Sequence, residues 1–269
     1  MEGLKGFWAT YFTARAAPLG RVGAGPVAAA FYNFHPAMVE RAVPACWDAL
    51  DPVEVTVRRA TAASEALRAA CSDEALGELV AALPELRAAA GPCTSPGRVL
   101  GSANSALWAS IAGRVEQRGG TGPPGEVAEA WQACTALREH RGDGHVAALV
   151  AHRISGLGAH LLAAGVAGVP ADLLRDNRGW SAARWDEDLA AMADRGLLEP
   201  DGRATVAGRA LHDSIETMTD VLAEPAYAEL SDREVNRLYG AVRACAEQVQ
   251  AAGLIPFPNP MGLPALQAP

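Results

Sequence analysis

The region that decides the fold runs from residue 145 to residue 222 and holds four segments whose apolar residues recur at helical spacing. They are HVAALVAHRISGLGAHLLAAG (145–165), ADLLRDN (171–177), SAARWDEDLAAMADRG (181–196) and AGRALHDSIETMTDVL (207–222). Between the last two lies LLEPDGRATV (197–206), in which Pro-Asp-Gly favours a tight turn between two short strands. This order predicts three helices, a small β-hairpin and a long fourth helix.

A third helix followed at once by a hairpin resembles winged-helix proteins of the MarR type, over residues 144–222. The chain as a whole is similar to a little-characterised actinobacterial family with a helix-turn-helix-like domain. Three segments carry that likeness, namely FYNFHPAMVERAVPACWD (31–48), LREHRGDGHVAALVAH (137–152) and RGWSAARWDEDLAAMADRGLL (178–198). The resemblance implies a winged-helix-like fold, and in MarR-type regulators the third helix enters the major groove of DNA.

The charge of this third helix disfavours DNA as a partner. Ser181 and Arg184 would suit a groove, and Arg203 and Arg209 stand near the hairpin, where arginines often touch DNA. DNA affinity nevertheless rests mainly on phosphate neutralisation by Lys and Arg, and the whole chain has a formal net charge of −8. The helix has two arginines, Arg184 and Arg195, and four acidic residues, Asp186, Glu187, Asp188 and Asp194.

The rest of the chain is predicted to be helical. Asp51 before Pro52 and Ser72 before Asp73 are typical helix starts, and Pro84 should kink or split the second of these helices. The segment 118–126, RGGTGPPGE, favours a boundary between an all-helical N-terminal region (1–122) and a winged-helix-like domain (123–269).

The expected C-terminal domain begins with a helix over 126–140 that ends at a tight RGDG turn (141–144). After its winged-helix core (144–222), the helix 231–253 is expected to pack on the N-terminal region or on a second subunit. The proline-rich tail 255–269 should lie extended on the surface.

The segment 137–152 concentrates residues capable of chemistry. His145 is a candidate general acid or base, because a histidine titrates near pH 6.5, at about the pH of the cell. Arg138 and Arg141 are candidates to hold an anionic group, and His152 lies two helical turns from His145. The simpler alternative assigns structural roles: Asp143 would cap the following helix, His140 and Arg141 would lie at a helix C-terminus, and the other histidines would be surface or core residues.

A second candidate site lies at the junction FYNFHP (31–36). Phe31, Tyr32 and Phe34 would form an aromatic wall, with His35 as a second candidate acid or base. Tyr32 or His35 is also a chemically competent haem ligand, but a lone histidine beside aromatic residues is commonly structural, so no cofactor is assigned. The structural alternative is a helix junction with core aromatics.

No metal site is predicted, because HxH and HExxH spacings are absent and the five cysteines are scattered without a CxxC pair. Scattered cysteines and an N-terminus without the features of a secretion signal favour the cytoplasm. No apolar run reaches the ~18 residues of a membrane span, so no membrane partner is expected.

Three functions fit these observations. The first is a small-molecule-binding protein, such as an enzyme of specialised metabolism, with a pocket between the N-terminal helices and the His/Arg-rich helix. The second is a MarR-like ligand-responsive regulator, which would require a homodimer to read palindromic DNA. The third is a protein-interaction module whose acidic helix faces a basic partner.

Overall fold

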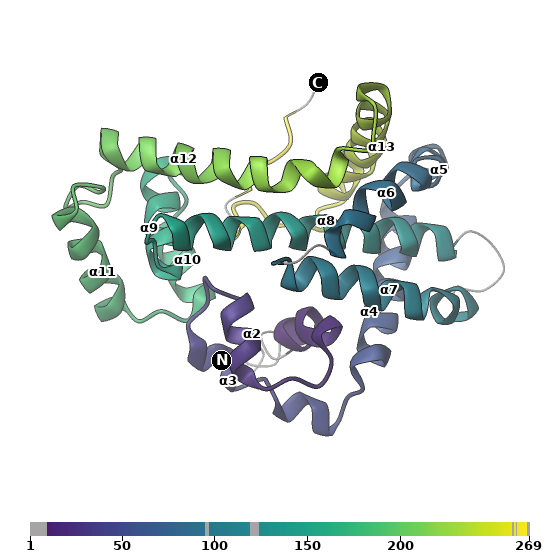
Figure 1. Ribbon diagram of the computed structural model, residues 1–269, viewed down its shortest axis with the longest axis horizontal. Helices are drawn as coiled ribbons and strands as arrows, with labels where there is room; N and C mark the ends of the chain where they lie inside the picture. The colour runs from purple at the N-terminus through teal and green to yellow at the C-terminus, as the bar shows by residue number, and fades with distance from the viewer. Residues whose placement is uncertain (1–9, 95–96, 119–123, 260, 262, 268–269) are drawn as a thin grey trace.

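A computed structural model describes residues 10–94, 97–118, 124–259, 261 and 263–267. Within these residues the fold is mainly α, as predicted, and no strand forms. Two long helices, α8 (Pro124–Ala151) and α12 (Val206–Ala223), run side by side along the molecule (Figure 1). The other helices gather around the two ends of this pair. The predicted domain boundary after residue 122 lies outside the described residues.

The N-terminal half is a succession of helices that begin where the sequence predicts. Asp51 caps the first long one by accepting hydrogen bonds from the amides of Val53 and Glu54, and Ser72 caps the next. Pro84 falls in the first turn after a break at Ala82, so the predicted split is confirmed. After helical residues 10–16 come η1 (Ala17–Leu19), α2 (Ala24–Ala30), α3 (Pro36–Glu40), η2 (Ala45–Asp48), α4 (Pro52–Ala70), α5 (Asp73–Ala81), α6 (Leu83–Ala90), η3 (Gly91–Thr94) and α7 (Val99–Arg118).

Helix α8 continues through the segment where a tight RGDG turn was predicted, so that prediction is wrong. His140 and Arg141 consequently lie inside the helix and not at its C-terminus. Asp143 does not cap its own helix; its carboxylate accepts hydrogen bonds from the amides of Leu100 and Gly101, at the start of α7. Gly144 allows close packing, since a Cβ there would lie 2.7 Å from Nη1 of Arg98 and 3.2 Å from Cβ of Leu222. Tertiary contacts thus override the turn propensity of the two glycines.

The predicted first helix of the helix-turn-helix region is in fact two helices. The chain bends by 97° between α8 and α9 (Gly156–Ala167), where Arg153 adopts a positive φ of 55° and Ser155 caps α9. One continuous helix would have placed His145 and Ala159 on the same face, but they lie on different helices, α8 and α9. Two predicted helices are confirmed, α10 (Ala171–Arg178) and α11 (Ala182–Asp194), and a three-residue turn that begins with Gly179 joins them.

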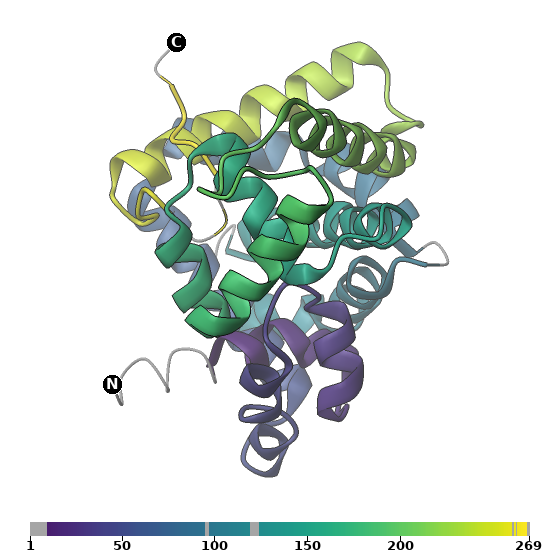
Figure 2. The same cartoon turned by 90° about the vertical axis from the view of Figure 1, so that its left-hand side faces the viewer.

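Figure 2 looks at the end of the molecule that α9, α10 and α11 form. Their core includes Leu161, Leu174, Trp185 and Met192, and Ile215 of α12 joins it. The last residues of α8, among them Leu149, contribute as well. We call α9 to α11 with residues 197–204 the helix-turn-helix unit. Both long helices pack into the core of this unit.

The predicted two-stranded wing is reduced to one isolated antiparallel bridge, between Leu198 and Ala204. The turn itself is present, since the amide of Glu199 donates to the carbonyl of Arg203 at 2.8 Å. The amide of Ala204 donates instead to the carbonyl of Gly165 in α9, at 3.1 Å. This segment is too short to pair further, and part of its hydrogen-bonding capacity is used by a helix.

After α12, the chain forms η4 (Glu224–Tyr227) and α13 (Asp232–Ala251), which starts with a capping box between Ser231 and Glu234. As predicted, α13 packs on the N-terminal region, where Leu238 joins a core with residues of α5, α6 and α8. The tail has no regular structure and returns along α13, where the amide of Leu266 donates to Gln250.

Among the described residues, no single helix is long and apolar enough to cross a membrane. The bent pair α8–α9 meets that test of length and composition only when its two helices are taken together.

Candidate functional site

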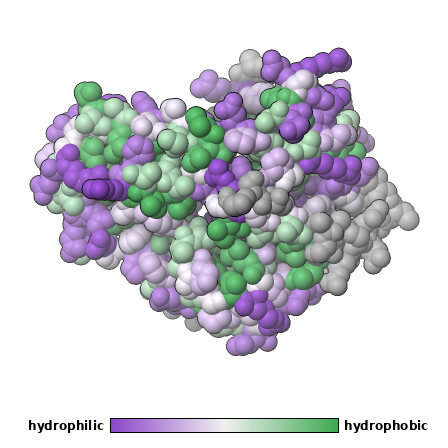
Figure 3. Space-filling model, viewed as in Figure 1, coloured by the Kyte–Doolittle hydropathy of each residue, from purple (hydrophilic) through white to green (hydrophobic). Residues whose placement is uncertain are grey.

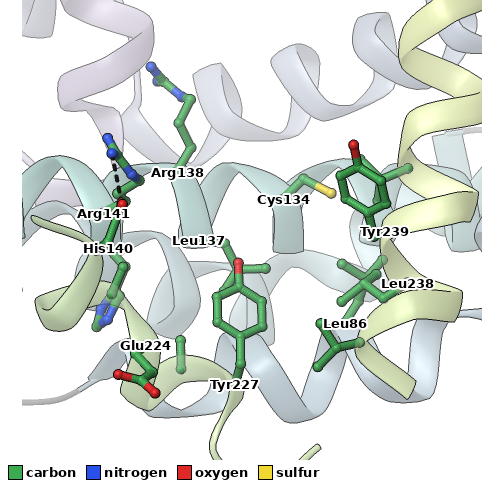
Figure 4. Close-up of a pocket in the computed structure, with 15 residues that line it drawn as sticks. Leu86, Cys134, Leu137, Arg138, His140, Arg141, Glu224, Tyr227, Leu238 and Tyr239 are labelled. Carbon is green, nitrogen blue, oxygen red and sulfur yellow. Dashed lines mark hydrogen bonds and ion pairs between the residues drawn. The ribbon is translucent and has the colours of Figure 1, made fainter. Parts of the chain in front are cut away.

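A pocket of about 560 Å³ opens where α6, α8, the end of α12, η4 and α13 meet (Figure 4). We call it the α8–α13 pocket. Its lining comes from segments up to 156 positions apart, from Leu86 to Val242, so it exists only in the folded chain. The residues are Leu86, Cys134, Leu137, Arg138, His140, Arg141, Asp220, Ala223, Glu224, Ala226, Tyr227, Val235, Leu238, Tyr239 and Val242.

The body of the pocket is apolar and aromatic. Tyr227 from η4 stands at its centre in Figure 4, in front of Leu137, and Tyr239 of α13 lies opposite Cys134. Burial raises the pKa of the Cys134 thiol to about 11 and also raises the pKa of Tyr227. These groups are therefore uncharged at neutral pH, and they offer a ligand apolar contact with a few hydrogen bonds.

His140 is the most unusual residue of the lining. It is only 3% exposed, and neither ring nitrogen has a hydrogen-bond partner among the described residues. Burial, and next the charge of Arg98, lowers the pKa of His140, so the imidazole is neutral at pH 7. A neutral imidazole carries one donor and one acceptor. Buried polar groups are rarely left without partners, so His140 is a candidate to bond a group that the folded chain does not itself supply.

The two arginines predicted to hold an anion line the pocket, but their charges are engaged. Arg141 forms ion pairs with Glu216 at 2.9 Å and Asp220 at 3.0 Å, both on α12. In Figure 4 the guanidinium of Arg138 points away from Tyr227 and Tyr239, and it pairs with Glu139 at 2.5 Å. The arginines therefore give the pocket little free positive charge.

The predicted catalytic residue His145 lies outside the pocket lining, on the contact between α8 and α12. Its Nδ1 is 3.0 Å from the hydroxyl of Thr219 and 3.5 Å from the carboxylate of Glu216. Burial lowers the pKa of His145, and Glu216 partly opposes that effect. His152 lies at the end of α8, half-buried and also outside the lining.

The second predicted constellation lies at the α2–α3 junction and not at the pocket. Nδ1 of His35 accepts a hydrogen bond from the amide of Ala37 at 3.2 Å and so caps α3. Phe31 and Phe34 are buried in an aromatic cluster with Phe12. The hydroxyl of Tyr32 donates to the carbonyl of Ile154 at 2.8 Å. These contacts match the structural alternative stated for this segment.

The sequence predicted Arg138 and Arg141 as candidates to hold a ligand but not the apolar residues beside them. Cys134 and Leu137 lie at helical spacing from these arginines along α8, a signal that was interrupted by the turn predicted at RGDG. No local pattern in the sequence marks Tyr227 and Tyr239 as pocket residues. They reach the pocket because η4 and α13 pack on α6.

In a MarR-type protein, α11 and the turn after it would face DNA. Here this surface carries acidic side chains, and its arginines pair with neighbouring carboxylates. On α11, Arg184 pairs with Asp188 at 2.8 Å, and in the turn Arg203 pairs with Asp201 at 2.7 Å. Asp186 and Glu187 are exposed beside them. Figure 3 shows hydrophilic residues gathered at this end of the molecule. Among the described residues, no three His, Cys, Asp or Glu side chains come together as a metal site.

The model of the helix-turn-helix family HTH_67 matches residues 2–256, nearly the whole chain. The protein therefore belongs to this helix-turn-helix family. Neither the curated proteins nor the solved structures that were compared contain a match.

Proposed function

We propose that this protein binds a mainly apolar small molecule in the α8–α13 pocket, with one hydrogen-bonding group of the ligand directed at His140. The observation that carries the proposal is the buried imidazole without a partner in the lining of a pocket of about 560 Å³. This volume falls within the range of roughly 300–1,000 Å³ that is usual for small-molecule sites.

The charges of the lining favour a neutral ligand over a strongly anionic one. Arg141 is already paired with two carboxylates, and Asp220 and Glu224 stand at the rim. A hydroxyl, carbonyl or amide group could donate to or accept from His140 without carrying a charge into the pocket. We therefore infer a ligand with an aromatic or aliphatic body that packs on Tyr227 and Leu137.

We infer that binding in this pocket would affect the helix-turn-helix unit, because α8 and α12 line the pocket and also pack into the core of that unit. The C-terminal half of α12 supplies Asp220 and Ala223 to the pocket, while Ile215 lies in the core of the helix-turn-helix unit. We propose that this unit has a MarR-like winged-helix plan whose acidic third helix does not read DNA. Either a sensor of a small molecule or an enzyme that acts on one would bind its ligand in this pocket.

The binding of N-phenyl-1-naphthylamine, an uncharged fluorescent aromatic probe, tests the proposal. Ala223→Trp places a large ring at the pocket, and we expect it to reduce probe affinity by at least about tenfold, as the loss of ~1.4 kcal/mol would. Ala190→Trp on the exposed face of α11 is the matched control and should leave the affinity unchanged. Equal binding by both variants and the parent protein would show that the probe binds elsewhere and would reject the pocket.

Native mass spectrometry of the purified protein, compared with its denatured mass, adds an independent test. A retained mass that Ala223→Trp abolishes and Ala190→Trp preserves would identify the natural ligand directly.

A ligand-responsive transcription regulator is the second candidate, and membership of a helix-turn-helix family favours it. Fluorescence polarisation with DNA from upstream of the protein's own gene tests it at two salt concentrations. A reader of DNA would bind selectively and lose affinity steeply with salt, because phosphate contacts release counterions. The ion pairs of Arg184 and Arg203 lead us to expect no selective binding even at low salt.

A further inference from the structure

A cluster of arginines surrounds one carboxylate between residues 10–16, α4 and α8. Nε and Nη2 of Arg15 donate to Glu139 at 3.1 and 2.8 Å, and Nη2 of Arg138 donates to the same carboxylate at 2.5 Å. Nη1 of Arg15 donates to the hydroxyl of Tyr11 at 2.5 Å. Every nitrogen of the Arg15 guanidinium is therefore engaged, while Glu139 already pairs with two cations.

Arg59 of α4 joins the cluster with much of its hydrogen-bonding capacity unused. Within the described residues its side chain makes one hydrogen bond, a long one of 3.4 Å from Nη1 to the carbonyl of Ala14. Its guanidinium lies over the ring of Trp131, 4.9 Å from the ring centre. It forms no ion pair within 4.0 Å in the described part of the chain. A guanidinium has five N–H donors, so Arg59 retains several for another partner.

The electrostatics of the cluster are unfavourable as it stands. Burial, and next repulsion by Arg138, lowers the pKa of Arg59 to about 10. Three guanidiniums face one carboxylate, so two positive charges have no carboxylate of their own. Partly buried charges are normally paired, which makes an excess of this kind a mark of a missing anion.

We propose that Arg59 and Arg138 together bind an oxyanion, a phosphate or a carboxylate group. The planar fork of each guanidinium can donate to two oxygens of such a group, and Trp131 holds the plane of Arg59 in place. The side chain of Arg138 is 41% exposed, so the site is open to solvent from that side. Arg138 also lines the α8–α13 pocket, but its guanidinium points away from Tyr227 and Tyr239 (Figure 4). The proposed anion site therefore lies outside the body of that pocket, and it goes beyond the binding of a neutral molecule there.

Thermal unfolding and titration calorimetry with inorganic phosphate test the proposal, with chloride at the same ionic strength as reference and succinate as a second arm. We expect phosphate or succinate at a hundredfold excess over Kd to raise the Tm by ~5 °C. The arm that responds identifies the group. Arg59→Gln should abolish the shift, and Arg59→Lys, which keeps the charge but loses the fork, should weaken binding by about tenfold.

Arg87→Gln is the matched control, because Arg87 is an exposed arginine that pairs with Glu129 away from the cluster. An equal rise of Tm in Arg59→Gln and Arg87→Gln would reveal a general salt effect and would overturn the proposal, as would the absence of any shift. Binding of the fluorescent probe to Arg59→Gln should stay unchanged, since that probe reports the α8–α13 pocket. This readout also shows whether the variant is folded, and it separates failure of the anion site from failure of the pocket.

Discussion

Arg15 and Glu139 are 124 positions apart in the sequence and form a two-bond ion pair with side chains only 15% and 4% exposed. The pair fastens the first described residues of the chain to the middle of α8. Burial works against the charged carboxylate, but Arg15 and Arg138 outweigh it and lower the pKa of Glu139. Glu139 is therefore ionised at neutral pH, and its charge holds the surrounding arginines.

The first prediction concerns this carboxylate. Glu139→Gln should lower the free energy of unfolding by about 3–5 kcal/mol, because it leaves partly buried cations without their counter-charge. Urea unfolding at pH 7 measures the effect. Glu129→Gln removes the partner of the exposed Arg87 and should cost at most about 1 kcal/mol. Similar losses in both variants would contradict a special role for the buried pair.

A second prediction concerns acid stability. Burial, followed by the charge of Arg178, lowers the pKa of His160 to about 3, and the Nε2 of this buried histidine is 3.1 Å from the carbonyl of Asn33. In the unfolded chain His160 takes up a proton near pH 6.5, whereas in the folded chain it stays neutral down to about pH 3. The contribution of His160 to the free energy of unfolding is therefore fully present above pH 6.5. It is lost as the pH falls toward 3, with a loss of about 2 kcal/mol at pH 5.

Urea unfolding at pH 7 and pH 5 measures this loss in the parent protein and in His160→Gln, which keeps a hydrogen-bond donor. The variant should show a smaller loss by about 2 kcal/mol. An identical pH dependence in the two proteins would mean that His160 titrates normally in the folded state.

A third prediction distinguishes a functional His140 from a structural one. His140→Leu removes two buried ring nitrogens without partners, so we expect the unliganded protein to gain about 1–2 kcal/mol of stability. The natural ligand detected by mass spectrometry should at the same time bind more weakly or be lost. If His140 is needed only for packing, the variant protein should instead be less stable and should bind the ligand as the parent protein does.

A fourth prediction tests the continuity of α8 with two neighbouring glycines. A Cβ at Gly142 would meet nothing within 4 Å, so Gly142→Ala should stabilise the helix by about 0.5–1 kcal/mol. A Cβ at Gly144 would lie 2.7 Å from Arg98 and 3.2 Å from Leu222, so Gly144→Ala should gain less or destabilise. Thermal unfolding compares the two. If Gly142→Ala destabilises the protein, the result would contradict a continuous α8 and indicate a turn at this position.

Local signals in the sequence predicted much of the fold. The caps Asp51 and Ser72 and the break before Pro84 act on neighbouring backbone groups, and the structure confirms all three. The same holds for α10, α11 and α12, whose apolar residues recur with the period of a helix. Membership of a helix-turn-helix family agrees with that prediction.

The positions of most helices and their order thus follow from local sequence, because helix starts and apolar periodicity depend on residues a few positions apart. The continuation of α8 through RGDG depends on distant contacts, since Asp143 accepts hydrogen bonds from α7 and Gly144 lies against Arg98. The tertiary structure also decided which side chains meet at the α8–α13 pocket. Tyr227 and His140 are 87 positions apart, and a pocket between them depends on long-range packing that no local pattern encodes.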